Sequence, residues 1–173
     1  MSRAFWVCLL IFGLILSFSM VDARSSNVVP VQGQSTSWDK KISGATRFKL
    51  VLDGQAVLDR ETGLVWEKSP DRLSPDVTWA DACSICIGRH VSGRMGWRLP
   101  TIEEFTSLIS ESQRDPALPA GHTFTNVQSG NYWSSTAWAY GNGSAWYVDF
   151  SWGYVDVRDK KRVLSVWCVR GAN

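Results

Sequence analysis

The feature that most constrains the fold is an aromatic stretch at residues 132–154, which reads YWSSTAWAYGNGSAWYVDFSWGY. It contains all 4 tyrosines of the chain and four of its 10 tryptophans. Aromatic side chains at this density indicate either a Trp-rich core or a surface that stacks on a ligand. Because Gly-containing turns interrupt the stretch, we expect its strand residues to serve the core and its turn residues to be available at the surface.

Alternation along this stretch and after it predicts strands. Trp146, Val148 and Phe150 share one parity and are expected in the core together with Trp133. Tyr147 has the opposite parity and is expected on the other face of the sheet. The elements predicted after the turn at Trp152 are a return strand at 154–158, a second turn at 159–161 and a last strand at 163–170.

The earlier part of the chain predicts strands first and helices second. Short strands are expected at 48–52, 56–59 and 64–67, the last two forming a hairpin around Gly63. Thr78 is a good N-cap for a first helix, with Asp81 as its capping partner. The apolar stripe of that helix consists of Trp79, Ala82, Cys83, Cys86, Ile87 and His90.

A second helix is predicted where Thr101 and Glu104 form a capping box. Its apolar face consists of Ile102, Phe105, Leu108 and Ile109. The loop expected at 115–130 leads into strands only. The order of strands, two helices and strands predicts an α+β fold with a mainly antiparallel sheet.

The N-terminus has the pattern of a secretory signal. Arg3 precedes a long apolar run, and the run ends in Val21-Asp22-Ala23, with small residues at −3 and −1. We expect residues 1–23 to be a cleaved signal peptide, residues 24–37 a flexible leader and residues 38–173 one domain. A retained anchor is the alternative, but the apolar run is shorter than the about 20 residues of a membrane span. The mature protein is thus expected to be periplasmic or secreted, with no stable membrane span.

Charge and cysteine content limit the possible partners and cofactors. The formal net charge is +2, which gives no case for a nucleic-acid partner. Cleavage would remove Cys8 and leave Cys83, Cys86 and Cys168, which in an exported protein indicates one disulfide and one spare thiol. The two histidines, His90 and His122, lack the spacing of a structural zinc site.

Six motifs occur in an order that resembles a known family. They are VLDRETGLVWEKSP, TWADACSIC, GWRLPTIEEF, YWSST, AWYVDF and VWCVRG. Together they resemble the Lcl C-terminal domain family, formerly a domain of unknown function and named for a collagen-like adhesin. The resemblance runs from about Trp38 to Gly171. It implies a fold similar to C-type lectins and the formylglycine-generating enzyme, with two helices packed on small twisted antiparallel sheets.

The resemblance also implies a disulfide and a class of function. The family pattern T-W-x-x-A-x-x-x-C places its cysteine on Cys86, and the terminal motif places the partner on Cys168, with Cys83–Cys168 as the alternative pairing. Family members are similar in being extracellular or envelope-exposed, and the namesake binds polyanions of the glycosaminoglycan kind.

No catalytic constellation accompanies these motifs, and we expect no enzyme activity. The sequence has no G-x-S-x-G, H-E-x-x-H or P-loop motif, and only Cys168 is available where the formylglycine-generating enzyme needs two cysteines. No cofactor is expected. Calcium is the alternative, because oxygen donors gather in one region of the sequence: Asn142, Asp149, Asp156 and Asp159.

The candidate ligand-binding residues are turn aromatics and a basic hairpin. The aromatic candidates are Trp138, Tyr140, Trp152 and Tyr154, and the basic ones are Arg158, Lys160, Lys161 and Arg162. A second basic group consists of Arg89, His90 and Arg94. These residues favour a non-catalytic, adhesin-like module that binds polyanionic or other glycans. The alternative is a structural or assembly component of the bacterial envelope that acts through protein–protein contacts.

Overall fold

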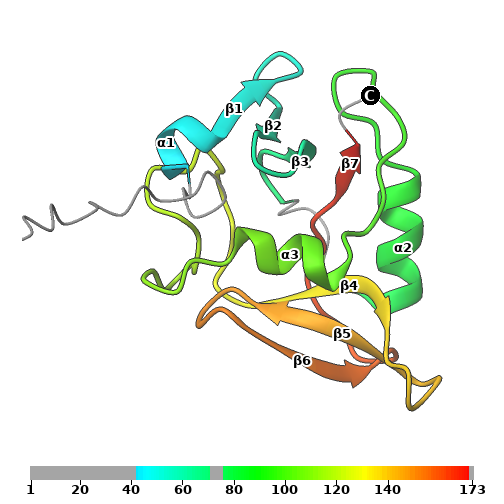
Figure 1. Ribbon diagram of the computed structural model, residues 1–173. Coiled ribbons are helices and arrows are strands. Elements are labelled where there is room, and N and C mark those ends of the chain that lie inside the picture. The colour runs from blue at the N-terminus through cyan, green and yellow to red at the C-terminus, as the bar shows by residue number, and fades with distance from the viewer. Residues whose placement is uncertain (1–41, 71–75, 172–173) are drawn as a thin grey trace, which may run out of the picture. The chain divides into compact units, whose positions relative to one another are not determined.

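The structure is a computed structural model that describes residues 42–70 and 76–171 (Figure 1). The predicted signal peptide, the leader and residues 38–41 lie outside the described residues, as does the loop at 71–75. The described part is α+β, with two small antiparallel sheets and few helices.

The first sheet has four antiparallel strands in the order β1-β2-β3-β7. Their bounds are β1 Phe48–Val51, β2 Ala56–Asp59, β3 Leu64–Glu67 and β7 Val169–Gly171. The hairpin predicted at 56–67 is confirmed, with Val57 opposite Trp66. The predicted last strand at 163–170 is wrong in its extent. Leu164 and Ser165 form only single bridges, to Val77 and Tyr132, because this segment changes partners as it passes from one sheet to the other.

The second sheet has three antiparallel strands in the order β4-β5-β6. They are β4 Asn131–Ala137, β5 Ser144–Asp149 and β6 Tyr154–Asp159. Figure 1 shows this sheet below α3, with the turn between β5 and β6 at one end and the loop between β4 and β5 at the other. β6 is an edge strand in which every residue except half-buried Val157 is exposed.

The two predicted helices are α2, Trp79–Ile87, and α3, Ile102–Leu108. The capping box of Thr101 and Glu104 is confirmed. Thr78 caps α2 by accepting from the Asp81 amide, while the Asp81 carboxylate accepts from the Thr78 hydroxyl. The predicted stripe of α2 is too long: the helix ends before Gly88, so His90 lies outside it.

Ile87 also departs from the prediction for α2. Its side chain is 70 % exposed, whereas Ala82 and Cys86 are fully buried. Residues 82 and 86 lie four apart on one face, and Ile87 is turned about 100° away from Cys86. In so short a helix the buried face is narrower than the apolar stripe in the sequence.

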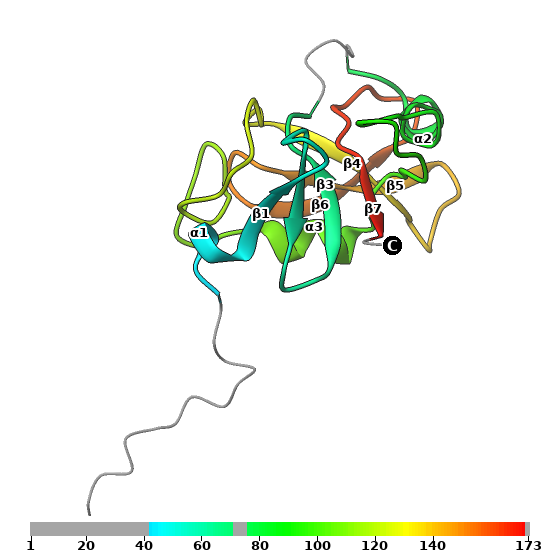
Figure 2. The same cartoon turned by 90° about the horizontal axis from the view of Figure 1, so that it is seen from above.

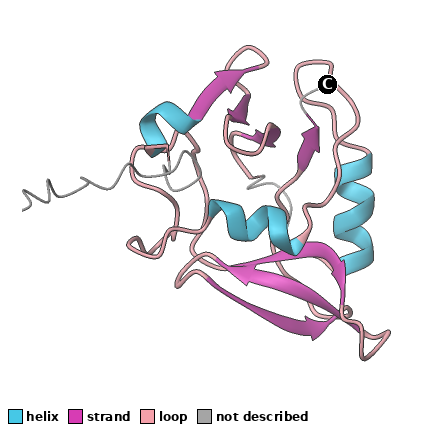
Figure 3. Ribbon diagram, viewed as in Figure 1, coloured by secondary structure: helices cyan, strands magenta, loops and turns pink. Residues whose placement is uncertain are grey.

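A short helix that the sequence did not predict, α1 Gly44–Arg47, precedes β1. It packs against the long loop between α3 and β4, drawn in pink in Figure 3. A Cβ on Gly44 would clash with the carbonyl oxygen of Ala120. Only glycine therefore allows this approach of the two backbones.

The interior divides into two clusters of buried side chains. The α2-side core consists of Ala56, Val65, Ala82, Cys86, Val91, Trp97, Leu99, Trp133, Ala145, Tyr147, Leu164, Val166 and Cys168. The α3-side core consists of Phe48, Val57, Trp66, Phe105, Leu108, Leu118, Phe124, Tyr132, Val148, Phe150, Trp167 and Val169. Figure 2 shows α2 and α3 on opposite sides of β7. Neighbouring strand residues thus enter different cores.

This arrangement corrects one prediction for the aromatic stretch. Trp133, Val148 and Phe150 are buried as predicted. Trp146, expected in the core, is only half-buried, whereas Tyr147 is 1 % exposed. Parity predicted one buried face, but both faces of β5 are buried. Tyr147 points into the α2-side core, and Val148 points into the α3-side core.

Candidate functional site

An aromatic cluster occupies the loop between β4 and β5. The Trp138 ring lies 5.2 Å from the Tyr140 ring and 5.1 Å from the Trp146 ring, the latter edge-on. Trp138 is half-buried by these contacts, and its amide donates to the Ser144 carbonyl. Tyr140 is 88 % exposed. In this cluster the Trp138 ring is therefore fixed by its neighbours, while the Tyr140 ring faces solvent.

Lys160 lies beside this loop and is held by several contacts. Its amide donates to the Gly143 carbonyl, and its carbonyl accepts from the Trp79 amide at the start of α2. The Lys160 ammonium lies 4.3 Å from the Trp79 ring centroid and donates to the Asn142 carbonyl at 3.2 Å. This ammonium ties α2, β6 and the β4–β5 loop together, so Lys160 is as much a structural residue as a candidate ligand contact.

The other predicted cations are more exposed. Lys161 and Arg162 lie in the turn after β6, where the Asp159 side chain and carbonyl accept from their amides. Arg158 lies on β6 with its guanidinium 4.9 Å above the Tyr147 ring. Lys161 and Arg162 are thus exposed cations that directly follow Lys160, the residue that contacts the aromatic loop.

Trp152 and Tyr154 lie at the opposite end of the sheet, in and after the β5–β6 turn. Trp152 is 64 % exposed. A Cβ on Gly153 would lie 2.9 Å from Ile109, which shows how closely the turn packs on the loop after α3. A hydrogen bond to Asp149 is the main cause that raises the pKa of Tyr154 to about 12.

The eight predicted ligand-binding residues thus form two groups. Trp138, Tyr140, Lys160, Lys161 and Arg162 lie at one end of the β4-β5-β6 sheet, which we name the aromatic–basic end. Trp152 and Tyr154 lie at the other end. Arg158 lies on β6 between the two groups. The register that places Ser144 opposite Asp159, and Asp149 opposite Tyr154, produces this separation.

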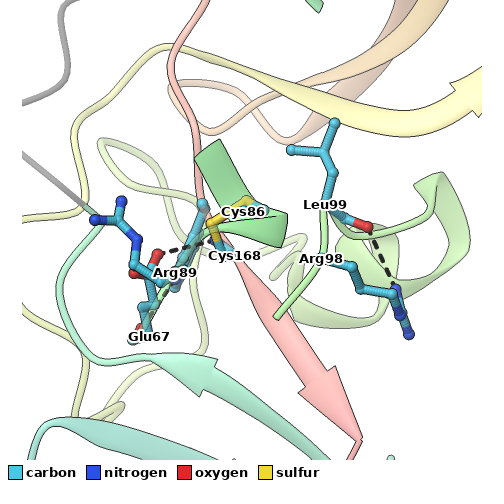
Figure 4. The surroundings of a disulfide bond; sticks show 7 residues. Glu67, Cys86, Arg89, Arg98, Leu99 and Cys168 are labelled. Carbon is cyan, nitrogen blue, oxygen red and sulfur yellow. Dashed lines mark hydrogen bonds and ion pairs between the residues drawn. A yellow bond between two sulfur atoms is a disulfide. The ribbon is translucent and has the colours of Figure 1, made fainter. Parts of the chain in front are cut away.

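The disulfide joins Cys86 of α2 to Cys168, with a Cα–Cα distance of 5.4 Å (Figure 4). This is the pairing that the resemblance implied, and among the described cysteines Cys83 is the one left as a free thiol. Beside the disulfide, Glu67 accepts from the Cys168 amide at 3.0 Å and pairs with Arg89 at 2.8 Å. The sequence placed Arg89 in a second basic group, but in the structure Arg89 forms an ion pair with a buried carboxylate.

Arg98 forms a second local ion pair, with Glu104. Two guanidinium nitrogens reach the two carboxylate oxygens, at 2.7 and 2.6 Å, and the same carboxylate accepts from the Thr101 amide. Burial alone would raise the pKa of Glu104, but these hydrogen bonds hold it below its ordinary value. The pair therefore fixes the start of α3 rather than presenting an acid or a base.

These contacts lie within a region shared with known proteins. A model of the Lcl C-terminal domain matches residues 55–170. The chain belongs to this family. A search of curated proteins returned no match. The Lcl C-terminal match includes both disulfide cysteines and both ends of the β4-β5-β6 sheet.

Within the Lcl C-terminal domain, the oxygen donors considered for calcium do not converge. Asp149 is buried and accepts from the Ser151 amide, while Asp156 and Asp159 accept from amides of the edge strand and its turn. Across residues 42–70 and 76–171, no three His, Cys, Asp or Glu side chains gather as a metal site. In the same ranges, no helix is both long and apolar enough to cross a bilayer.

The sequence did not predict a cleft of about 740 Å³ beside α1 and the C-terminal end of α3, one wall of which lies before the matched region. Hydroxyl side chains dominate its polar wall: Ser43, Thr106, Ser107, Ser110 and Ser112. Arg47 lies in the same wall, paired with Asp59 and Glu61. Ser43 lies far in the chain from the hydroxyl residues between Thr106 and Ser112, so nothing in the sequence could have located this cleft.

Proposed function

We propose that the protein is an exported, non-catalytic module that binds polyanionic glycans through the aromatic–basic end. The observation that carries the proposal is the exposed Tyr140 ring beside packed Trp138, next to the cations of the turn after β6. Aromatic rings stack on the apolar faces of sugars, and exposed ammonium and guanidinium groups pair with sulfate or carboxylate. The two kinds of group lie together in the part of the sheet where a polymer could contact both.

Two further features support the proposal. A disulfide is expected in an oxidising compartment, in agreement with cleavage of residues 1–23 and export. We further propose that the two antiparallel sheets and two main helices form a C-type-lectin-like arrangement, in which ligand contacts come from loops at one end of a sheet. Fold alone does not define the ligand, so the proposal rests on the side chains.

The test is retention on immobilised heparin, a sulfated glycan, over a salt gradient. Removing the two free cations in a Lys161→Gln/Arg162→Gln variant should lower the salt concentration at elution. If each cation displaces one counterion, the slope of log affinity against log salt becomes shallower by about two. Tyr140→Ala should weaken binding at every salt concentration, because stacking does not depend on charge.

The matched control is Arg60→Gln/Arg114→Gln. It removes the same charge from exposed side chains away from the aromatic–basic end. Equal losses in the two double variants would mean that binding follows net charge alone, and the proposed site would be wrong. Unchanged retention in the Lys161/Arg162 variant would also reject it.

The second candidate function is a structural or assembly component of the envelope. It is favoured by Trp152, which is exposed on the turn opposite the aromatic–basic end. Tryptophan commonly anchors protein–protein interfaces. A stable protein partner that is lost in Trp152→Ala, in a protein with no heparin retention, would support this function over glycan binding.

A further inference from the structure

Among the described residues, no strand pairs with the outer edge of β6. β6 pairs with β5 on one side only, and it forms the outer edge of its sheet (Figure 1). In an antiparallel pair, alternate residues direct their N–H and C=O groups to the partner strand and away from it. Because the Lys160 amide donates to Gly143 across the pair, alternation turns the amides of Val155, Val157 and Asp159 outward.

The middle of this edge shows an outward amide directly. The Val157 amide donates to the carboxylate of its neighbour Asp156, at 2.7 Å. The Asp156 side chain thus accepts the hydrogen bond that a neighbouring strand would otherwise accept from the Val157 amide. Exposed edges of this kind are templates for pairing, and charged side chains or prolines commonly protect them from it. β6 has no proline, and because its charges are of both signs they repel only strands whose charges do not match them.

The charges of β6 are complementary to those of a second β6 strand that runs antiparallel to it. In an antiparallel pair of two β6 strands, outward-facing residues must lie opposite each other, which allows only registers that differ by two residues. With Val157 opposite Val157 of the second copy, Asp156 lies opposite Arg158 twice. Shifting the register by two residues in either direction places Asp156 opposite Asp156 or Arg158 opposite Arg158. Of these three registers, which pair most of the strand, only the central one avoids a like-charge pair.

We propose that two copies of this protein associate through antiparallel pairing of their β6 strands, with the two-fold axis at Val157. The Val157 amides then donate to each other's carbonyls, and the Asp156 carboxylates are released to pair with Arg158 of the second copy. The association joins two three-stranded sheets into one of six strands. Such an interface is isologous, as in most soluble dimers.

Pairing changes which side chains lie together. In the central register Tyr154 lies opposite Lys160 of the second copy. The exposed Trp152 of one copy thereby comes next to the aromatic–basic end of the other. In one copy the two groups of candidate residues lie apart. If the proposed glycan function holds, pairing brings one group of each copy next to the other group of its partner, which gives two composite sites.

The experiment measures association without any ligand, so its outcome is independent of glycan binding. The protein, expressed from its full-length sequence and purified, is examined by analytical ultracentrifugation over a range of micromolar concentrations. We expect a concentration-dependent dimer. Asp156→Arg places Arg opposite Arg in the pair and should raise the dissociation constant by at least about 100-fold. Arg158→Asp should do the same by placing Asp opposite Asp.

The two variants also provide the rescue. Asp156→Arg mixed with Arg158→Asp restores both opposite-charge pairs and should form a heterodimer, and the double variant in one chain should again self-associate. Glu111→Arg, an exposed charge reversal on another loop, should leave the dimer intact. A wild-type protein that stays monomeric throughout this range overturns the proposal. So does a dimer that Asp156→Arg does not weaken, or a mixture of folded variants that does not associate.

Discussion

The two cores of this domain are stabilised in different ways. Seven of the 12 residues in the α3-side core are aromatic, whereas the α2-side core has three aromatics among 13 and contains small side chains and the disulfide. Trp167 is at the centre of the aromatic core, with ring centroids 5.0 to 6.3 Å from its neighbours Trp66, Phe105, Phe124, Tyr132 and Phe150. One side is thus held by buried ring area, the other by a covalent bond.

The difference shows how one small domain can support two sheets. Large rings bury much apolar surface and fill the space between the sheets on the α3 side. On the α2 side, Ala56, Ala82 and Ala145 allow the backbones to come close, but they bury little surface. The Cys86–Cys168 bond offsets that deficit by restricting the unfolded chain.

The largest loss of stability is expected from Trp167→Ala. Removing this ring leaves a cavity among five aromatic neighbours and deletes the hydrogen bond from its indole to the Glu67 carbonyl. The free energy of unfolding should fall by about 5 kcal/mol. Chemical denaturation followed by tryptophan fluorescence measures the change. Trp167→Phe is the control and should lose about half as much; equal losses would argue against packing as the cause.

Removing the disulfide should have the next largest effect. In Cys86→Ala/Cys168→Ala, an 82-residue separation is no longer cross-linked, and loop entropy predicts a loss of about 4 kcal/mol. Cys83→Ala, which removes the free thiol of the same helix, should change stability by less than about 1 kcal/mol. A comparable loss in the control would show that side-chain packing, rather than the cross-link, stabilises the α2 side.

Acid should affect the ion pairs that pack beside the α3-side core. Hydrogen bonds from Arg47 and the Glu61 amide keep the pKa of Asp59 below its ordinary value despite burial, and Glu104 is held low by Arg98. A depressed folded pKa gives stability that is complete above the unfolded value and lost as pH falls through the folded one. The contribution of these two carboxylates to the free energy of unfolding should therefore be nearly constant from pH 7 to about 5 and fall below about 4.

Glu104→Gln tests this account of the acid response. Because Arg98 is partly exposed, the variant should lose only about 1 to 2 kcal/mol at pH 7. It should also lose less on acidification than the wild type, which denaturation at a series of pH values measures. An identical acid response in both proteins would mean that Glu104 does not contribute to it.

The smallest effect is expected from Ile87→Lys. Its side chain is exposed at the C-terminal end of α2, where a cation interacts favourably with the helix dipole. Thermal denaturation should show a change within about 0.5 kcal/mol. A loss above 2 kcal/mol would indicate that Ile87 is covered in the protein and would contradict the narrow buried face of α2.

Local sequence patterns correctly predicted the structural elements that depend on residues close together in the chain. The hairpin around Gly63, the N-cap at Thr78 and the Thr101–Glu104 capping box all depend on residues a few positions apart, and all are present. The disulfide partner of Cys168 was implied only by family resemblance, since Cys83 and Cys86 lie within one turn of each other. The α1 helix had no sequence signal, because it depends on the close approach of Gly44 to Ala120.

The candidate site could be predicted only as a set of residue types. Composition indicated the turn aromatics and the basic hairpin, but which of them meet depends on strand register. The bond from Lys160 to Gly143 brings the turn after β6 to the β4–β5 loop, and the same register carries Trp152 to the far end. Tyr147 lies on the predicted face of β5 but is buried, and Trp146 is only half-buried, because both faces of this strand are packed against other parts of the domain, which parity alone does not show.

The Cys86–Cys168 bond has a consequence for survival among proteases. The long surface loop between α3 and β4 lies between these two cysteines in the chain, and loops of this kind are common sites of cleavage. A single cut there yields two fragments that remain covalently joined. A nicked protein would migrate as one species on a gel until a reductant separates it. The cross-link thus allows the β4-β5-β6 sheet to remain attached to the rest of the domain after the chain has been cut.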